Sequence, residues 1–312
     1  MVGHSAWAEW KVDGELNAFY TSDVSLFSAS QRLNPLEDPT QPVIDTVRQG
    51  SDSVTEPVLT LRRSLEPSWG KMELAVKGQG FVFAQHSQFN HGTFGASVTQ
   101  ELSKDSLVRV RYHYSPNLFL GINKAGNGQL QKEQVTTHFG AIDIERKILE
   151  QLMVRMAGRY GQRLYNESFT RRNTRFWTVG THIEWEIIPE VELLLGYHYE
   201  RGTANGGIAG EAFEDISAFV HYAVAELEIH VTRQTTLALA FDFEQTHYLT
   251  KSPDDERMNG LENIYQGEIS LRQAVRDNLD LTVTYQSGRR KSSFEDRAGV
   301  INTAWVGGVF RF

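Results

Sequence analysis

The chain has 312 residues, of which 40% are hydrophobic and 11% aromatic, and its formal net charge is −8. The acidic balance, with no basic stripe interleaved with stacking aromatics, excludes a nucleic-acid partner. The lack of cysteine excludes a small disulfide-stapled fold, and the lack of any apolar run near the roughly 18 residues of a membrane helix excludes a helical membrane protein.

The N-terminal segment, Met1 to Ser5, has neither the basic region nor the apolar region of a secretory signal. We therefore expect the sequence to be a mature or trimmed form of an exported protein, without its signal peptide. Length alone does not decide between one large domain and two, so the pattern along the chain has to decide.

Apolar and polar residues alternate from one end of the chain to the other. Clear cases are Leu107 to Tyr114, Trp177 to Trp185 and Leu237 to Glu244. A period of two is typical of a β-strand with one apolar face and one polar face. In chain order, such runs predict strands at residues 7–20, 53–65, 71–85, 92–102, 106–119, 133–147, 150–164, 174–187, 191–203, 214–231, 235–248, 261–274, 279–290 and 300–312.

The connections between these strands alternate in length. Short turns lie near 66–70, 103–105, 149–150, 189–190, 232–234 and 276–278, and longer polar segments lie at 26–52, 86–91, 120–132, 165–173, 204–213, 249–260 and 291–299. Outer-membrane barrels have an even number of strands, short periplasmic turns and longer external loops. The sequence therefore predicts a single domain, residues 1–312, that is an all-β, transmembrane, antiparallel up-and-down β-barrel of about 14 strands in a bacterial outer membrane.

A soluble β-sandwich or lipocalin-like barrel is the alternative, because it also alternates. The chemistry of the two faces favours the membrane barrel. The polar faces carry closely spaced charges, such as Arg109 with Arg111 and Asp242 with Glu244, while the apolar faces hold Leu, Val, Phe, Tyr and Trp. Aromatic residues near strand ends are typical of interfacial girdles.

The last predicted strand, Ile301 to Phe312, resembles the C-terminal assembly signal of bacterial outer-membrane proteins, since Gly307, Phe310 and Phe312 match its Gly-x-x-hydrophobic-x-aromatic ending. This resemblance implies recognition by the barrel-assembly machinery. The segment Gly14 to Val24 resembles the first strand of barrels that follow periplasmic tetratricopeptide regions, although it departs from that form at Thr21 and Asp23. The second resemblance implies a periplasmic or surface partner protein.

If the apolar faces meet lipid, the polar faces line the lumen. Arginine then dominates the first half of the barrel wall and carboxylate the second, and such opposed walls produce a transverse field that orients polar solutes. The alternative is that these groups pair with one another, with Asp143 and Glu145 neutralising part of the arginine wall. The predicted pore-lining residues are Arg62, Arg109, Arg111, His113, Arg155, Arg159, Glu184, Glu226, Glu228, Asp242, Glu244 and Glu268.

Other residue patterns give weaker hypotheses. The carboxylates Glu226, Glu228, Asp242 and Glu244 come from neighbouring strands, so they suit a cation site or an acid/base pair, but a solvated lumen wall is the preferred interpretation. His182 and Glu184 share a face without a third ligand at a recognisable spacing. With no nucleophile motif and no nucleotide loop in the glycine-rich stretch 202–210, we expect no enzyme, no metal and no cofactor.

The leading functional prediction is a passive channel or exporter pore for small polar or charged solutes. A non-conducting barrel that anchors a periplasmic or extracellular assembly is the alternative, and an outer-membrane enzyme comes third. The first long loop, with Pro35, Pro39 and Pro42, is long enough to fold inward and constrict the pore. Charged segments in or beside the loops, Asp254 to Glu256 and Arg289 to Lys291, could contact outer-membrane lipid and lipopolysaccharide, although solvated surface charge is the simpler interpretation.

Overall fold

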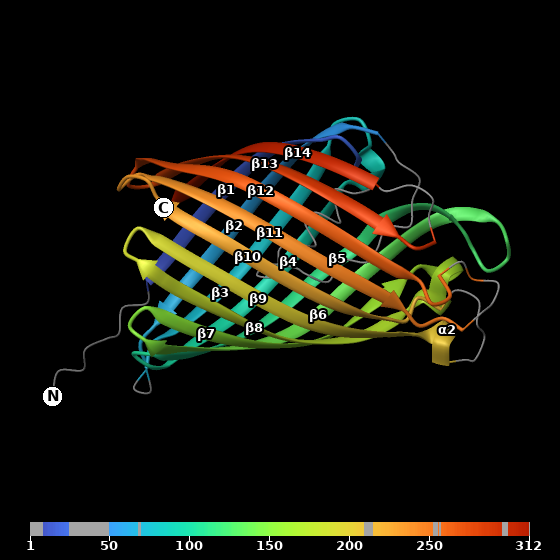
Figure 1. The fold of residues 1–312 in the computed structure, drawn as a ribbon, viewed down its shortest axis with the longest axis horizontal. Coiled ribbons are helices and arrows are strands. Elements are labelled where there is room, and N and C mark those ends of the chain that lie inside the picture. Colours follow the sequence, from blue (N-terminus) through green and yellow to red (C-terminus); the bar gives the residue numbers. More distant parts are fainter. Residues whose placement is uncertain are drawn as a thin grey trace.

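The computed structural model describes residues 9–24, 50–67, 70–208, 215–251, 255, 257–294 and 299–311. Each strand pairs antiparallel with its chain neighbours, and β1 pairs with β14 to close the barrel (Figure 1). The predicted all-β up-and-down barrel of 14 strands is therefore confirmed. The strands are β1 (Glu9–Thr21), β2 (Asp52–Leu65), β3 (Met72–Phe83), β4 (His91–Ser103), β5 (Ser106–Lys124), β6 (Leu130–Leu149), β7 (Leu152–Tyr165), β8 (Thr174–Ile188), β9 (Val191–Ala204), β10 (Ala218–His230), β11 (Thr235–Tyr248), β12 (Leu261–Arg276), β13 (Leu279–Ser292) and β14 (Gly299–Arg311).

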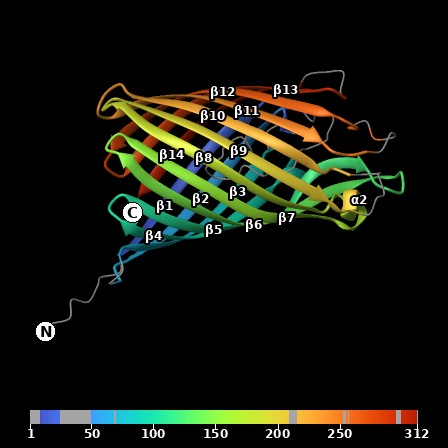
Figure 2. The ribbon, with the colours of Figure 1, turned by 60° about the horizontal axis from the view of Figure 1, so that its bottom comes forward.

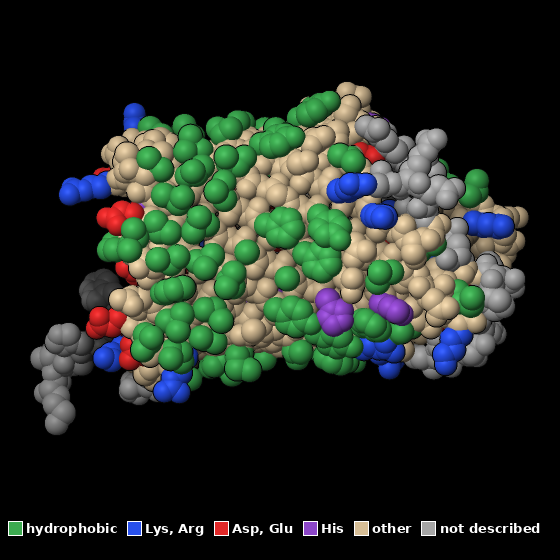
Figure 3. Space-filling model, viewed as in Figure 1, with side chains coloured by type: hydrophobic (Ala, Val, Ile, Leu, Met, Phe, Trp, Pro, Cys, Tyr) green, Lys and Arg blue, Asp and Glu red, His purple; other side chains and the backbone are tan. Residues whose placement is uncertain are grey.

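The polar face of each strand points into the barrel and the apolar face points outward. On β8, Thr178 and His182 are buried, whereas Val179 and Ile183 between them and beyond them are 52% and 39% exposed. This arrangement is the reverse of a soluble β-sandwich, which hides its apolar face. Figure 3 shows the result as a belt of hydrophobic side chains across the face of the outer wall that is in view.

The short turns gather at one end of the barrel and the long connections at the other (Figures 1 and 2). The C-terminal end of β14 lies at the end with the short turns, as expected for the periplasmic side. The long connections contain short helical turns, namely η1 (Ser87–Phe89), η2 (Glu167–Arg172) and α2 (Asn205–Ile208). No helix among the described residues is long and apolar enough to cross a membrane.

One predicted loop is wrong. Residues 120–132 are mostly a hairpin, because β5 continues to Lys124 and β6 begins at Leu130. Two irregularities interrupt the pairing, between Ser115 and Leu118 and between Phe119 and Gly121, which has φ +139. These irregularities break the alternation of apolar and polar residues, so the sequence pattern predicts an end of the strand before its real end.

Several other expectations fall on residues outside the described part of the chain. These are Phe312, Asp254, Glu256 and most of the first long loop, including Pro35, Pro39 and Pro42. The ends of that loop are described, and the Val24 amide donates a hydrogen bond to the Gly50 carbonyl over 2.9 Å. The two ends of the loop are therefore held together at the mouth of the barrel.

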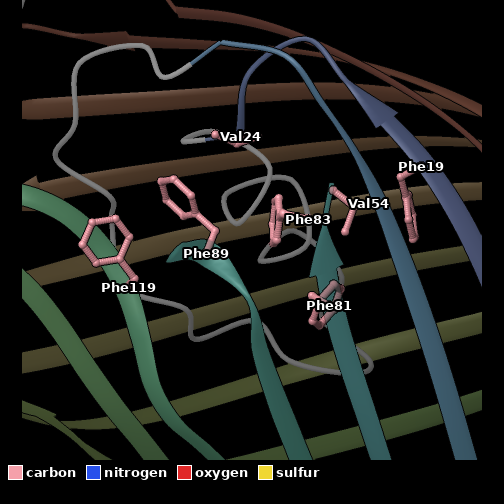
Figure 4. Packing of buried hydrophobic residues seen from close by; sticks show 7 residues of the cluster. All are labelled: Phe19, Val24, Val54, Phe81, Phe83, Phe89 and Phe119. Atoms are coloured by element: carbon pink, nitrogen blue, oxygen red, sulfur yellow. The ribbon is translucent and has the colours of Figure 1, made fainter. Parts of the chain in front are cut away.

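An aromatic cluster lies inside the barrel near its long-connection end, which we call the mouth cluster (Figure 4). It consists of Phe19, Val24, Val54, Phe81, Phe83, Phe89 and Phe119. The Phe89 ring meets the Phe119 ring edge-on at 5.1 Å and the Phe83 ring at 5.8 Å. The inner wall of β1 to β5 thus carries an aromatic cluster at this end, beside a few buried polar groups such as Asp52, and becomes more charged farther along the axis.

Candidate transport lumen

A cavity of about 570 Å³ lies inside the barrel against β1 to β5. Several inward positions of β3 and β4 carry short side chains there, namely Ala75, Thr93, Gly95 and Ser97, which leave space between the longer side chains of this wall. Phe81 from the mouth cluster also borders the cavity. The hollow part of the lumen therefore lies to one side of the barrel axis and adjoins the mouth cluster.

Cationic side chains outnumber carboxylates around this cavity. The cations are Arg62, Lys77, Arg109, Arg111 and Arg311, and the carboxylates are Asp13, Glu15 and Glu73. Arg62 forms an ion pair with Asp13, and its Nε lies 4.0 Å from Glu73 Oε1. Arg311 lies 2.6 Å from Asp280.

The arginines of β5 lie between the cavity and their carboxylate partners on β6. The Arg109 side chain is 32% exposed while its partner Glu145, 3.4 Å away, is 7% exposed. Arg111 is 22% exposed and lies 2.7 Å from Asp143, which is 2% exposed. The cavity therefore meets guanidinium groups first, and the compensating carboxylates lie behind them in the wall.

A chain of ion pairs continues from β5 around to β8. Glu145 Oε1 lies 2.8 Å from Arg155 Nε as an ion pair, and Arg155 Nη2 donates to Glu184 Oε1 at 3.0 Å. Arg109, Glu145, Arg155 and Glu184 thus alternate in sign across neighbouring strands. Asp143 and Glu145 neutralise part of the arginine wall, so the lumen does not consist of one uniformly positive wall opposite one uniformly negative wall.

The lumen side formed by β7 to β9 is filled by large buried side chains. His182 and His198 are each 2% exposed, and their Nε2 atoms lie 2.5 Å apart. A Cβ at Gly180 would lie 2.2 Å from His198 Nδ1, so this glycine is required for the imidazole to fit. Arg163 donates to Glu200 over 2.8 Å and stacks 4.4 Å above the Phe176 ring.

The carboxylates of β10 to β12 are spread along the wall by the strand register. Glu226 and Glu268 both flank Ala240, while Asp242 lies opposite Val224. Gln266 donates to Asp242 at 3.4 Å and Gln286 donates to Glu268 at 3.1 Å. Glu228 lies 3.6 Å from Arg272, and Glu244 accepts from Thr246 at 3.1 Å. Among the described residues, no group of three or more His, Asp or Glu side chains is placed to hold a metal ion.

Every predicted pore-lining residue has its side chain on the inward face, but only Arg62, Arg109, Arg111 and His113 border the cavity. The inward residues predicted from the sequence did not include Lys77, Arg311 or the buried His198. The alternation of β3, β9 and β14 would have placed all three inward.

Gly307 of the predicted assembly signal points inward and Phe310 outward at 41% exposure, and the role of this signal stays a prediction.

No family model and no curated protein matches the chain. Solved structures do match. The outer membrane channel DcaP of Acinetobacter baumannii aligns with a TM-score of 0.57 and 9% identity over 98% of this chain and 97% of that chain. A bacterial polysaccharide outer membrane secretin gives 0.52 and 11% over 96% and 98%, and the anion-selective porin from Comamonas acidovorans gives 0.50 and 9% over 99% and 100%. At such identities the likeness concerns the fold alone, and that fold is the β-barrel of bacterial outer-membrane channels and porins.

Proposed function

We propose that this protein is a passive channel of the bacterial outer membrane for small polar or charged solutes, with anions preferred. The observation that supports this most is the cavity of about 570 Å³ against β1 to β5, where arginines lie in front of their carboxylate partners. A cavity of this size suits small solutes rather than polymers.

The outer surface supports a place in a membrane. Val179, Tyr160 and Val283 are 52%, 59% and 57% exposed, and many other large apolar side chains share this face. A soluble protein rarely leaves an apolar surface of such extent in water. Transmembrane barrels carry an outward apolar band of this kind, and lipid covers it.

The arrangement of charges supports the anion preference. A low-dielectric wall that places guanidinium groups at a cavity raises the local concentration of anions there. The partner carboxylates Asp143 and Glu145 are nearly inaccessible, so they attract few cations into the cavity. Arg62 on β2 also borders the cavity, but there its charge is balanced by Asp13 and by the nearby Glu73, which border the cavity too.

The test is the reversal potential of single channels in a planar lipid bilayer under a salt gradient. Wild-type protein is expected to give ohmic steps with an anion preference. Arg109→Gln is the informative variant, because Glu145 keeps Arg155 as its partner at 2.8 Å and the wall stays neutralised. We expect this variant to lower the anion-to-cation permeability ratio at least two-fold.

Arg272→Gln is the matched control, because Arg272 is an inward arginine on β12 that is 48% exposed and does not border the cavity. Its permeability ratio should stay close to that of the wild type. A cation preference in the wild-type protein, or equal effects of the two variants, would contradict the proposal.

A non-conducting barrel that anchors a periplasmic or surface protein is the second candidate. The buried His182, His198 and Arg163 favour it, because they fill one side of the lumen. Absence of current from protein that is well inserted would favour this candidate. That the protein is not an enzyme stays a prediction.

A further inference from the structure

Basic side chains gather on the outward face of β8 to β13, near the long-connection end of the barrel. We call them the outer basic arc. Its members are Arg175, Arg201, His221, His247, Arg289 and Lys291. Figure 3 shows Lys, Arg and His side chains along the right-hand edge of the hydrophobic belt, on the side toward the long connections. These side chains belong to the surface that faces lipid, not to the lumen.

Strand register places the members of the arc in neighbouring rows. Arg201 lies opposite Phe219, which lies opposite His247. In the next row toward the short-turn end, His221 lies opposite Gln245, Gln245 opposite Asn263, and Asn263 opposite Lys291. Cross-strand neighbours lie about 5 Å apart, so these rows form one surface across five strands, in which basic and amide side chains are interleaved with aromatic ones.

On the described outward face of β8 to β13, the outer basic arc has no acidic counterpart. Among the described residues of β8 to β13, no Asp or Glu side chain points outward. Arg175, Arg201, Arg289 and Lys291 form no ion pair with a described carboxylate. By contrast Arg290, between two members of the arc, points inward and lies 2.6 Å from Glu262. Cations at a lipid-facing surface are costly unless they lie at the interface and meet an anion there.

An aromatic ladder beside the arc supports a position at the depth of the headgroups. The Trp177 and Tyr199 rings lie 5.5 Å apart, Tyr199 stacks on Phe219 at 6.3 Å, and Phe219 stacks on His247 at 4.7 Å. The Tyr197 hydroxyl lies 2.6 Å from Nδ1 of His221. Outward tyrosine and tryptophan mark the membrane–water interface, and the long connections mark the external side.

We infer that the outer basic arc binds the phosphate groups of lipid A, the phosphorylated glycolipid of the outer leaflet. Guanidinium groups donate paired hydrogen bonds to phosphate oxygens, and Lys291 and the two histidines add further donors. The binding is one-sided, because the outward faces of β1 to β4 carry no Lys, Arg or His at the long-connection end among the described residues. This inference is independent of whether the lumen conducts.

The test is native mass spectrometry of the purified barrel in detergent, titrated with bis-phosphorylated lipid A. The wild type is expected to retain lipid A after activation has removed the detergent. The triple variant Arg201→Gln, Arg289→Gln, Lys291→Gln is expected to lose at least ten-fold in affinity. Arg146→Gln is the matched control, because Arg146 is exposed on β6 beside the short-turn end, away from the arc.

Folding of each variant is checked by heat-modifiable migration on a denaturing gel, so a loss of lipid is assigned only to folded barrels. Removal of both phosphates from lipid A should abolish the difference between wild type and triple variant. Equal retention of lipid A by the two proteins would overturn the inference. Equal affinity for phosphatidylglycerol, lost in the same variant, would overturn the assignment to lipid A.

Discussion

Inward polar side chains are accommodated differently on the two sides of the lumen. On the β1 to β5 side, short side chains leave a cavity, and Arg109 and Arg62 keep 32% and 39% of their side-chain surface exposed. On the β7 to β9 side, Arg155 and Arg163 keep only 15% and 12%, and imidazole and phenyl rings fill the space between them. Both sides pair their arginines with carboxylates, but the arginines of the β1 to β5 side also border the cavity, whereas those of the β7 to β9 side are enclosed by protein.

The largest effect on stability is expected from breaking the ion-pair chain on the filled side. Arg155→Gln leaves Glu184 without its 3.0 Å partner and Glu145 with only the more distant Arg109. Removing one member of a buried pair costs about 3 kcal/mol. Arg62→Gln on the open side should cost no more than about 1 kcal/mol, as for exposed pairs.

Urea unfolding of both variants in detergent micelles or lipid vesicles measures this difference, with the wild type as reference. Equal destabilisation by the two substitutions would show that the two sides are equally solvated. The β1 to β5 side would then not be the more open side of the lumen.

A smaller effect is expected from a matched pair of glycine substitutions. Gly180→Val forces a side chain against His198, since even its Cβ would lie 2.2 Å from the ring, whereas a Cβ at Gly95 finds its nearest heavy atom, Lys77 Cβ, at 3.8 Å. Gly180→Val should therefore destabilise the barrel by about 1–3 kcal/mol, as overpacking does.

Gly95→Val should leave stability nearly unchanged but lower single-channel conductance, because Gly95 borders the cavity. The two readouts are measured on both variants. A stability loss for Gly95→Val as large as that for Gly180→Val would indicate that the open side is also close-packed.

The strands and the side of the sheet on which each residue lies could be predicted from the sequence, because a period of two records both at once. Trp177 and His182 are assigned to opposite faces by counting alone. The same counting places Arg290 on the inward face and its neighbours Arg289 and Lys291 on the outward face. The three residues therefore do not form one basic surface segment. Residues 120–132 were wrongly predicted as a loop, because bulges near Gly121 shift the alternation there.

The position of the cavity and the pairing of charges could not be predicted in this way. They depend on strand register, which alternation does not contain. Glu226 and Asp242 lie on adjacent strands, yet the register places Asp242 opposite Val224 rather than opposite Glu226. The partnership of His182 with His198 likewise requires that Gly180 and Gly196 lie beside them, which only the paired strands reveal.

The most direct test of the central claim, that solutes pass along β1 to β5, uses the absence of native cysteine in the chain. Ser97 borders the cavity, and Thr178 is an inward residue of β8 that is 4% exposed. Single S97C and T178C variants are recorded in a planar bilayer while a negatively charged methanethiosulfonate reagent is added. We expect the current through S97C to fall within minutes and the current through T178C to stay unchanged. Modification of T178C with block of the current, and no response from S97C, would contradict it.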